Sequence, residues 1–244
     1  MHRFYADESR LSSGLAYLTA EDARHATRVL RMSPGQQAEV FLQGRRYLGE
    51  IAEIAGDDVA LRLTGELPST EPRLRVTLYQ GLPKADKMEL IIQKAVELGA
   101  EAVVPVAMSR AVVRLDDREG RRKQERWQKI AREACKQSGR CLTPTVDAPI
   151  SFKALLNRLS GHDAAIVPWE DAQGYSLNAF HRDHPNTTSL AVVIGPEGGM
   201  SPEEVAAMKQ AGCLPVTLGP RILRTETAGL AAISALMCLY GEME

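Results

Sequence analysis

Two glycine-rich segments contain the residues of this chain best placed to do chemistry. The first is Gly195-Pro196-Glu197-Gly198-Gly199, directly after the apolar run 190–194, and the second is residues 218–228, LGPRILRTETA, after the run 214–218. Short apolar runs predict buried parallel strands, and open α/β sheets bind ligands beyond the carboxyl ends of their strands. Glycine allows the backbone to approach a ligand closely and to adopt positive φ. Each segment alone could be a tight structural turn, but two at successive strand ends favour a ligand crevice.

The spacing of the glycines limits the kind of ligand. Neither segment contains G-x-x-x-x-G-K-[ST] or G-x-G-x-x-G, which disfavours an ATPase and a Rossmann dehydrogenase. A crevice without a phosphate signature suits a ligand bound through an adenine edge and a sugar. We expect no metal site, because the four cysteines form no C-x-x-C pair and lack the spacing of zinc ligands. We expect all four to be reduced: Cys135, Cys141, Cys213 and Cys238.

The elements that must position these loops alternate between strand and helix from residue 73 onward. Alternation of this kind predicts an α/β fold with a parallel sheet covered on both faces. Ser201, Pro202 and Glu204 form the N-cap, first position and capping-box acid of one helix. The strands are predicted at 75–80, 102–106, 164–167, 190–194 and 214–218, and the helices at 84–98, 118–138, 152–159, from Ser201, and at 227–239.

Residues 1–70 predict a smaller, β-rich unit. Thr19 is the expected N-cap of a helix over 20–31, which Ser33-Pro34-Gly35 ends. Strands are predicted at 37–42, 47–54 and 59–63. Pro68 and Pro72 bracket small polar residues and indicate a linker. The chain is therefore expected to have two domains, 1–70 and 73–244.

The charge distribution points to a polyanionic partner. The net charge is −1, but residues 110–140 carry eleven Lys or Arg against five Asp or Glu, a local excess of six positive charges. Such a stripe suits a nucleic-acid backbone, although a solvated helix face explains it equally well. No apolar run approaches the roughly 20 residues that span a bilayer, and residues 1–8 show no apolar signal region. We expect a cytoplasmic protein with no membrane partner.

Several blocks in order along the chain resemble the ribosomal RNA small-subunit uridine-N3 methyltransferases of the SPOUT superfamily. The resemblance covers essentially the whole chain. It rests on the two glycine segments, on Lys84-x-x-Lys87-Met88-Glu89 with Gln93-Lys94-x-x-Glu97-Leu98-Gly99, on Glu133-Ala134-x-x-Gln137-Ser138-x-Arg140, and on Arg3-Phe4-Tyr5 with His25-x-x-Arg28-Val29-Leu30-Arg31.

The resemblance implies a fold, a cofactor and a partner that spacing alone does not show. It implies a trefoil-knotted α/β SPOUT methyltransferase domain after a small N-terminal PUA-like β-barrel that binds RNA. The cofactor would be S-adenosyl-L-methionine, and the substrate N3 of a uridine in 16S ribosomal RNA, within the small ribosomal subunit or its late precursor. The family works as a homodimer with the cofactor site near the interface. The apolar last helix suits burial there or in the core of its own chain.

The chemistry of this methyl transfer suggests candidate roles for residues. Arg224 first, and Arg140 second, would neutralise charge developing on the uracil. Glu197 or Glu226 would accept the N3 proton, or instead tie a loop to an arginine. The expected cofactor residues are Ile194, Gly195, Pro196, Glu197, Gly198, Gly199, Leu218, Gly219, Ile222, Leu223, Arg224, Thr225, Thr227 and Ala228. The expected RNA-binding residues are Arg3, Arg24, Arg28, Arg31, Lys84, Lys87, Arg121, Arg122 and Lys123.

Two alternatives stay open. The chain could be another SPOUT enzyme, acting on a different nucleotide or on transfer RNA. It could also be a non-enzymatic RNA-binding assembly factor that kept the fold. The intact glycine segments argue against the second alternative, because a protein that only binds RNA needs no cofactor crevice.

Overall fold

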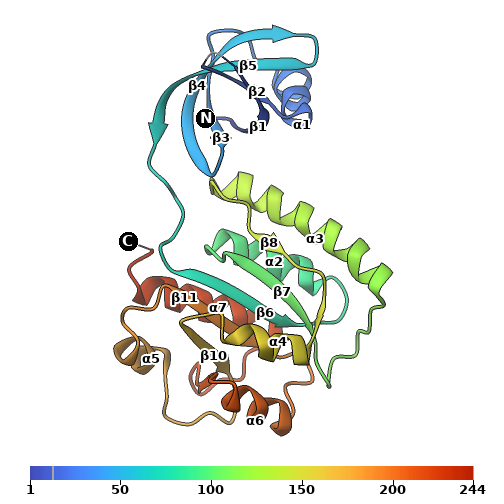
Figure 1. Cartoon of the computed structure of the whole chain (residues 1–244), viewed down its shortest axis with the longest axis vertical. Coiled ribbons are helices and arrows are strands. Elements are labelled where there is room, and N and C mark those ends of the chain that lie inside the picture. The colour runs from blue at the N-terminus through green and yellow to red at the C-terminus, as the bar shows by residue number, and fades with distance from the viewer. Residues whose placement is uncertain (13, 244) are drawn as a thin grey trace. The chain divides into compact units, whose positions relative to one another are not determined.

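The structure, a computed structural model, describes residues 1–12 and 14–243. It divides into two compact units (Figure 1). Unit 1 contains Met1–Glu71 and Cys135–Thr143, and unit 2 contains Pro72–Ala134 and Pro144–Glu244. The segment 135–143, which the sequence places within the second domain, therefore belongs with the N-terminal unit by its contacts.

Unit 1 is a closed barrel with the strand order β1-β2-β5-β4-β3. Its strands are β1 (Arg3–Ser12), β2 (Leu15–Leu18), β3 (Gln37–Leu42), β4 (Arg45–Ala55) and β5 (Asp58–Leu67). Gln43 and Gly44 both have positive φ, the backbone that a tight two-residue hairpin between β3 and β4 requires. Phe4, Val40, Ile51 and Leu61 fill the barrel. Sequence reasoning did not predict β1 or β2. β1 pairs with the neighbouring β2 and with β3, and β2 also pairs with β5.

The prediction of one α-helix over 20–31 is wrong for the second half of that range. Thr19 does cap α1, but α1 ends after one turn (Ala20–Arg24) and continues as a π-helical turn, His25–Val29. Arg31 then adopts a left-handed conformation with φ 52°. In a regular helix over 20–31, Arg24, Arg28 and Arg31 would lie on one face, at positions i, i+4 and i+7. They do not share a face here, because a π turn shifts the register and Arg31 lies outside the helix.

Unit 2 is built on a parallel sheet with the order β12-β10-β11-β6-β7-β8, and β9 also pairs with β7. The longer strands match the predicted runs, and every pairing in this sheet is parallel, as expected. Sequence reasoning missed the two-residue strands. The strands are β6 (Arg75–Gly81), β7 (Ala102–Ala107), β8 (Thr145–Val146), β9 (Ile150–Ser151), β10 (Ala164–Pro168), β11 (Ser189–Ile194) and β12 (Leu214–Val216).

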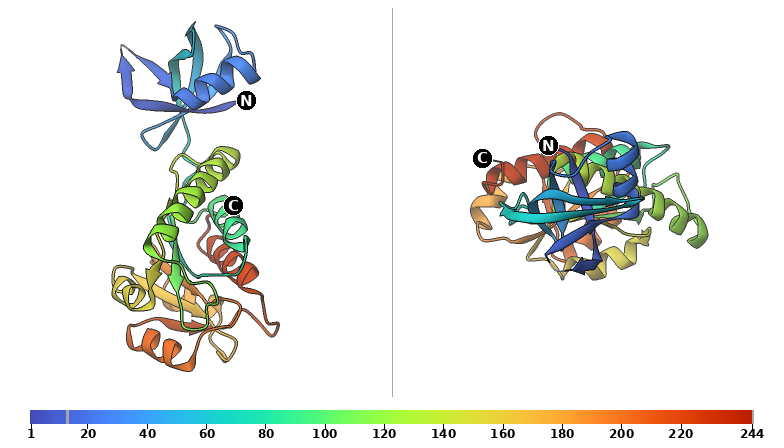
Figure 2. Two further views of the ribbon diagram at one scale, coloured as in Figure 1. Left: turned by 90° about the vertical axis from the view of Figure 1, so that its right-hand side faces the viewer. Right: turned by 90° about the horizontal axis from the view of Figure 1, so that it is seen from above.

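Helices cover both faces of this sheet, as Figures 1 and 2 show. α4 and α6 pack on the face that carries Tyr79, Val104 and Val193. α7 packs against α2 and lies on the opposite face. The helices are α2 (Lys87–Glu97), α3 (Asp117–Ser138), α4 (Phe152–Leu159), α5 (Leu177–Asp183), α6 (Pro202–Gln210) and α7 (Thr225–Leu239). The capping box of Ser201 and Glu204 is present, and only α5 was not predicted.

The last helix is mostly core. Ile233, Leu236 and Met237 are buried within unit 2, while Leu230 and Leu239 stay half-buried. No helix in the described ranges combines the length and apolarity needed to cross a membrane.

Candidate active site

Three loops meet at the carboxyl ends of three neighbouring strands in unit 2. They follow β12, β10 and β11, which are adjacent in the sheet. Between them lie two adjoining cavities of about 400 and 340 Å³, within the size range of small-molecule sites. Six residues line both cavities: Pro168, Trp169, Glu170, Ile222, Leu223 and Ala228. The two glycine segments therefore do form one crevice.

Glycines keep the crevice loops tightly packed. A Cβ on Gly81, at the end of β6, would lie 2.6 Å from the Pro196 backbone nitrogen. A Cβ on Gly195 would lie 2.9 Å from Met200, and one on Gly198 would lie 3.0 Å from the Arg110 carbonyl oxygen. Gly219 is different, because a Cβ there meets no atom within 4 Å, but φ is +100°. A side chain at Gly81, Gly195 or Gly198 would therefore crowd neighbouring protein atoms, whereas Gly219 is required for its positive φ.

Thr225 ties the two glycine segments together. Its buried hydroxyl donates to the Gly195 carbonyl oxygen at 2.6 Å and accepts from the Gln80 amide at 2.8 Å. Gln80 is fully buried at the end of β6. The start of α7, the loop after β11 and the strand β6 are thus held by one hydrogen-bonded chain.

A three-residue charge cluster lies at one end of the crevice. The Lys87 ammonium, in the first turn of α2, is 3.1 Å from Glu197 Oε1 and 3.0 Å from Glu226 Oε2. The Glu197 carboxylate also accepts from the Lys84 backbone N–H at 3.0 Å. Sequence reasoning assigned Lys87 to RNA, but the structure gives it two carboxylates within the protein.

These contacts shift the pKa values of all three groups. Hydrogen bonds that Lys87 donates to Glu226, and next to Glu197, raise the pKa of Lys87. Burial favours a higher pKa for Glu197, but hydrogen bonds from backbone N–H groups and from Lys87 outweigh it and lower the pKa. The Glu226 carboxylate accepts a hydrogen bond from its own backbone N–H, which lowers its pKa. Burial opposes this shift, and Lys87 adds to it. Both carboxylates are therefore held ionised and are weak bases.

Arg224 lies beside this cluster and is not bound by it. The residue is the N-cap of α7, is exposed, and lines the crevice with Lys87 and Glu197. Within residues 1–12 and 14–243, no hydrogen bond or ion pair engages its guanidinium. The guanidinium is thus available to an incoming group.

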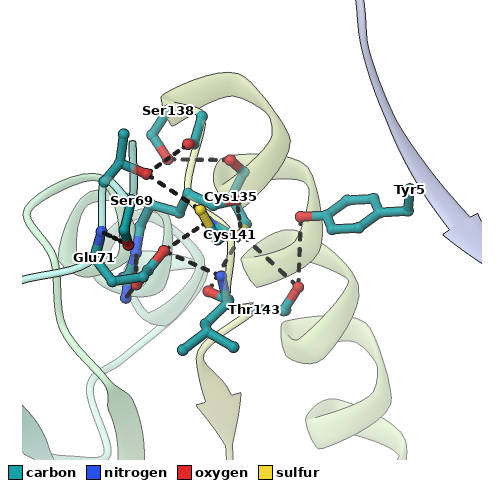
Figure 3. Close-up of polar contacts among 11 residues, drawn as sticks. Tyr5, Ser69, Glu71, Cys135, Ser138, Cys141 and Thr143 are labelled. Carbon is teal, nitrogen blue, oxygen red and sulfur yellow. Dashed lines mark hydrogen bonds and ion pairs between the residues drawn. The ribbon is translucent and has the colours of Figure 1, made fainter. Parts of the chain in front are cut away.

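Arg140 has the opposite environment. It lies in unit 1, is 6% exposed, and donates from Nη2 and Nε to Glu71 Oε2 at 2.7 and 3.1 Å. Glu71 Oε1 also accepts from the backbone N–H groups of Cys141 and Leu142 (Figure 3). Arg140 is not among the residues that line either cavity. Its contacts are those of a buried structural ion pair.

Comparison with known proteins places the chain in a family. The RNA methyltransferase domain family matches residues 70–237, and the RNA methyltransferase PUA domain family matches residues 18–64. The chain belongs to the RNA methyltransferases. It is 40% identical to ribosomal RNA small subunit methyltransferase E of Bacillus subtilis, over 90% of this chain and 88% of the relative. It is 32% identical to the protein of the same name from Mycobacterium bovis, over 96% and 90%.

Solved structures agree with that membership. Ribosomal RNA small subunit methyltransferase E from Neisseria gonorrhoeae, bound to S-adenosyl methionine, superposes with a TM-score of 0.85 at 34% identity, covering 98% of both chains. A Legionella pneumophila methyltransferase in complex with the same cofactor gives 0.82 at 30% identity, covering 97% and 96%. Unit 2 of this methyltransferase is a SPOUT fold, and unit 1 is a PUA-like barrel.

The crevice of the methyltransferase contains most of the predicted cofactor residues and some that were missed. Gly198 and Thr227 do not line it, although both belong to lining segments. Four of the missed lining residues lie at the end of β10 or shortly after it: Pro168, Trp169, Glu170 and Ala172. The rule that found the other loops also applied there, but this loop has no glycine pair to mark it. The other missed residues are Lys87, Met200, Thr217, Pro220 and Arg221.

The predicted RNA-binding residues differ in exposure and in their contacts within the protein. Arg121, Arg122 and Lys123 are exposed on α3, and Lys84 is exposed before α2. In unit 1, Arg28 pairs with Asp57 at 2.8 Å, and Arg3 donates to the Gln137 carbonyl oxygen at 2.7 Å. The remaining two are exposed: Arg24 and Arg31.

Proposed function

We propose that this protein uses S-adenosyl-L-methionine to methylate N3 of a uridine in 16S ribosomal RNA, during maturation of the small ribosomal subunit in the cytoplasm. The observation that carries the proposal is a glycine-walled crevice at the carboxyl ends of parallel strands, with an unpaired arginine on its lining. The names of the relatives at 40% and 32% identity support a ribosomal RNA substrate.

The crevice fits this cofactor in size and in chemistry. Backbone at Gly199 and Gly219, where an added Cβ would meet no atom closer than 3.7 Å, leaves room for an adenine and a ribose to approach. Trp169 adds an aromatic surface. The Glu170 carboxylate lines both cavities and suits a ligand that carries cationic groups. When bound, S-adenosylmethionine supplies a methyl group activated by a positive sulfur.

Arg224 has the main chemical role in this proposal. Uracil N3 carries a weakly acidic proton and is a poor nucleophile until the proton leaves. In the reaction, N3 loses its proton to water, forms a bond to the methyl carbon, and the carbon–sulfur bond breaks with its electron pair remaining on sulfur. Arg224 stabilises negative charge on the uracil before that bond forms. The lowered pKa values of Glu197 and Glu226 make them poor proton acceptors, so we assign them to binding Lys87.

The substrate must present N3 unpaired, because N3 lies on the base-pairing edge of uracil. We propose that the exposed basic residues of α3 and the PUA-like barrel bind the surrounding phosphates. The trefoil knot, the homodimer and the domain division at residues 70–73 are part of the same proposal. The half-buried Leu230 and Leu239 of α7 support a dimer contact.

Removal of the gene followed by nucleoside mass spectrometry tests the proposal. Small-subunit RNA from the deletion strain should lack 3-methyluridine, and the wild-type gene should restore it. Isothermal titration with S-adenosylmethionine then separates an enzyme from an assembly factor, which would not bind the cofactor. Loss of a methyl group from transfer RNA or from another ribosomal nucleotide would contradict the proposed substrate.

A further inference from the structure

Lys87 contacts the carboxylates of Glu197 and Glu226, and Arg224 lines the same cavity as Lys87. The Lys87 ammonium contacts Glu197 and Glu226 at about equal distances, 3.1 and 3.0 Å. All three side chains are only partly exposed, at 29%, 25% and 20% for Lys87, Glu197 and Glu226. Solvent therefore screens these contacts less than it screens a surface ion pair.

Glu226 is also a ready partner for Arg224. The two residues are two positions apart at the start of α7, and the charge of Arg224 contributes to the lowered pKa of Glu226. An arginine and a carboxylate form the strongest common ion pair, with two parallel hydrogen bonds. Nevertheless the structure shows Glu226 bound to Lys87, with no bond from Arg224 to it among the described residues.

The backbone just before α2 positions Lys87 between the two carboxylates. Ala85, two residues before Lys87, has a φ of 53°, which is unusual for a residue with a side chain. This turn directs the Lys84 N–H to Glu197, and α2 then begins at Lys87. Strain of this kind persists only where surrounding contacts hold it, and here both neighbouring lysines contact Glu197.

We propose that Lys87 is a positioning residue that occupies Glu197 and Glu226 and thereby leaves the Arg224 guanidinium free for the RNA substrate. The inference rests on the proposed function of Arg224. In the absence of Lys87, Glu226 would lose its cationic partner and bind Arg224 instead. The Arg224 guanidinium would then be bound to Glu226 and unavailable to the RNA substrate.

A double-mutant cycle tests this inference with single-turnover methylation at saturating cofactor. Lys87→Met should lower the rate by about tenfold, part of the 10²–10³-fold that complete removal of such a donor costs. Adding Glu226→Gln to Lys87→Met should raise the rate again, because the competing charge is gone. Lys87→Arg, which can still bridge two carboxylates, should keep the rate. Lys94→Met is the matched control, since Lys94 on α2 pairs with its neighbour Glu97 and, within residues 1–12 and 14–243, with no other carboxylate.

The Arg224→Ala background separates this inference from the proposed function. If Lys87 acts through Arg224, Lys87→Met should have no further effect there. A lower rate for the double variant than for Arg224→Ala, or no recovery on adding Glu226→Gln, would overturn the positioning role alone. A wild-type rate for Arg224→Ala itself would instead overturn the proposed role of Arg224.

Discussion

Two charge clusters in this protein use similar residues and differ in what they leave unpaired. In unit 1, Glu71 holds Arg140 and two backbone N–H groups, and the side chains of Arg140 and Glu71 are 7% and 14% exposed. In unit 2, Lys87 binds Glu197 and Glu226, and the guanidinium of the exposed Arg224 beside them makes no hydrogen bond or ion pair in the part of the chain that the structure describes.

The difference teaches how to tell a structural arginine from a functional one. A buried guanidinium with a full set of acceptors is costly to disturb and offers nothing to a substrate. An exposed guanidinium whose nearby carboxylates already have a cation keeps its donors for an incoming anion. From the sequence, both arginines were candidates for the same chemical role, and only their partners in the structure separate them.

The largest expected effect comes from breaking the unit 1 cluster. Glu71→Gln should lower the free energy of unfolding by roughly 3–5 kcal/mol, because the buried Arg140 guanidinium loses the carboxylate charge that accepts two of its hydrogen bonds. Urea unfolding measures this. Glu66→Gln is the matched control, since its exposed pair with Arg45 contributes only about 0–1 kcal/mol. Equal effects of the two variants would mean that the Glu71 cluster is not structural.

Removing the free arginine should act on turnover instead of stability. Arg224→Ala should reduce single-turnover methylation by about two to three powers of ten, the cost of one preorganised donor. Cofactor affinity and melting temperature should change little, because the side chain is exposed and unbonded. Arg182→Ala, an exposed arginine on α5, is the control. A large drop in melting temperature with near-normal turnover would remove Arg224 from the chemistry.

A substitution in the loop after β11 should weaken cofactor binding while leaving Arg224 and Arg140 unchanged. A valine at Gly198 would place its Cβ 3.0 Å from the Arg110 carbonyl oxygen, so the loop must move. We expect the affinity for S-adenosylmethionine to fall by at least about tenfold, a cost of about 1.4 kcal/mol, with a native circular dichroism spectrum. Gly65→Val in unit 1, where a Cβ meets no atom within 4 Å, is the control. Unchanged affinity in Gly198→Val would exclude this loop from the site.

The basic residues of α3 should affect RNA affinity alone. Replacing Arg121, Arg122 and Lys123 with Glu should weaken RNA binding and reduce its salt slope by about one for each lost phosphate contact. Filter binding at several salt concentrations measures the slope. An unaltered slope would mean that these exposed side chains form only a solvated face.

The smallest effect concerns His162, which is half-buried at the opposite end of the sheet. Its ring nitrogens contact the Tyr79 hydroxyl and Ser189, both at 3.0 Å. Burial lowers the pKa of His162 below 6.5. The negative charges of Glu101 and Asp163 oppose this shift, and the positive charge of Arg75 adds to it. The folded state therefore favours the neutral ring, and stability present above pH 6.5 is lost as the pH falls toward the folded pKa. Melting curves of His162→Gln should lose this step, and an unchanged pH profile would contradict it.

Sequence reasoning reached the parts of the fold that local pattern determines. The buried runs of unit 2 predicted its longer strands, and Ser201 with Glu204 predicted a helix start, because periodicity and capping act within a few residues. The π turn at His25–Val29 and the short α5 were missed, since packing against distant strands decides such elements. β1 was also missed; its parallel pairing with β3 joins segments far apart in the chain, although its other partner, β2, is the next strand.

The candidate site was predictable in its loops and not in its contacts. Gly195 and Gly219 mark their loops by type and position, so the crevice was foreseeable. The partners of Lys87 and Arg140 come from segments more than sixty residues away, and no spacing rule reports them. The loop after β10 was accessible in principle, because it too ends a parallel strand.

Transfer of a deuterium-labelled methyl group tests the central claim most directly. The purified protein is incubated with labelled S-adenosylmethionine and small subunits from a strain that lacks the gene, and the RNA nucleosides are analysed by mass spectrometry. The account predicts that the label appears on N3 of a uridine in the small-subunit RNA and that Arg224→Ala slows its appearance. Label at another atom or nucleotide, or none on the RNA, would contradict it.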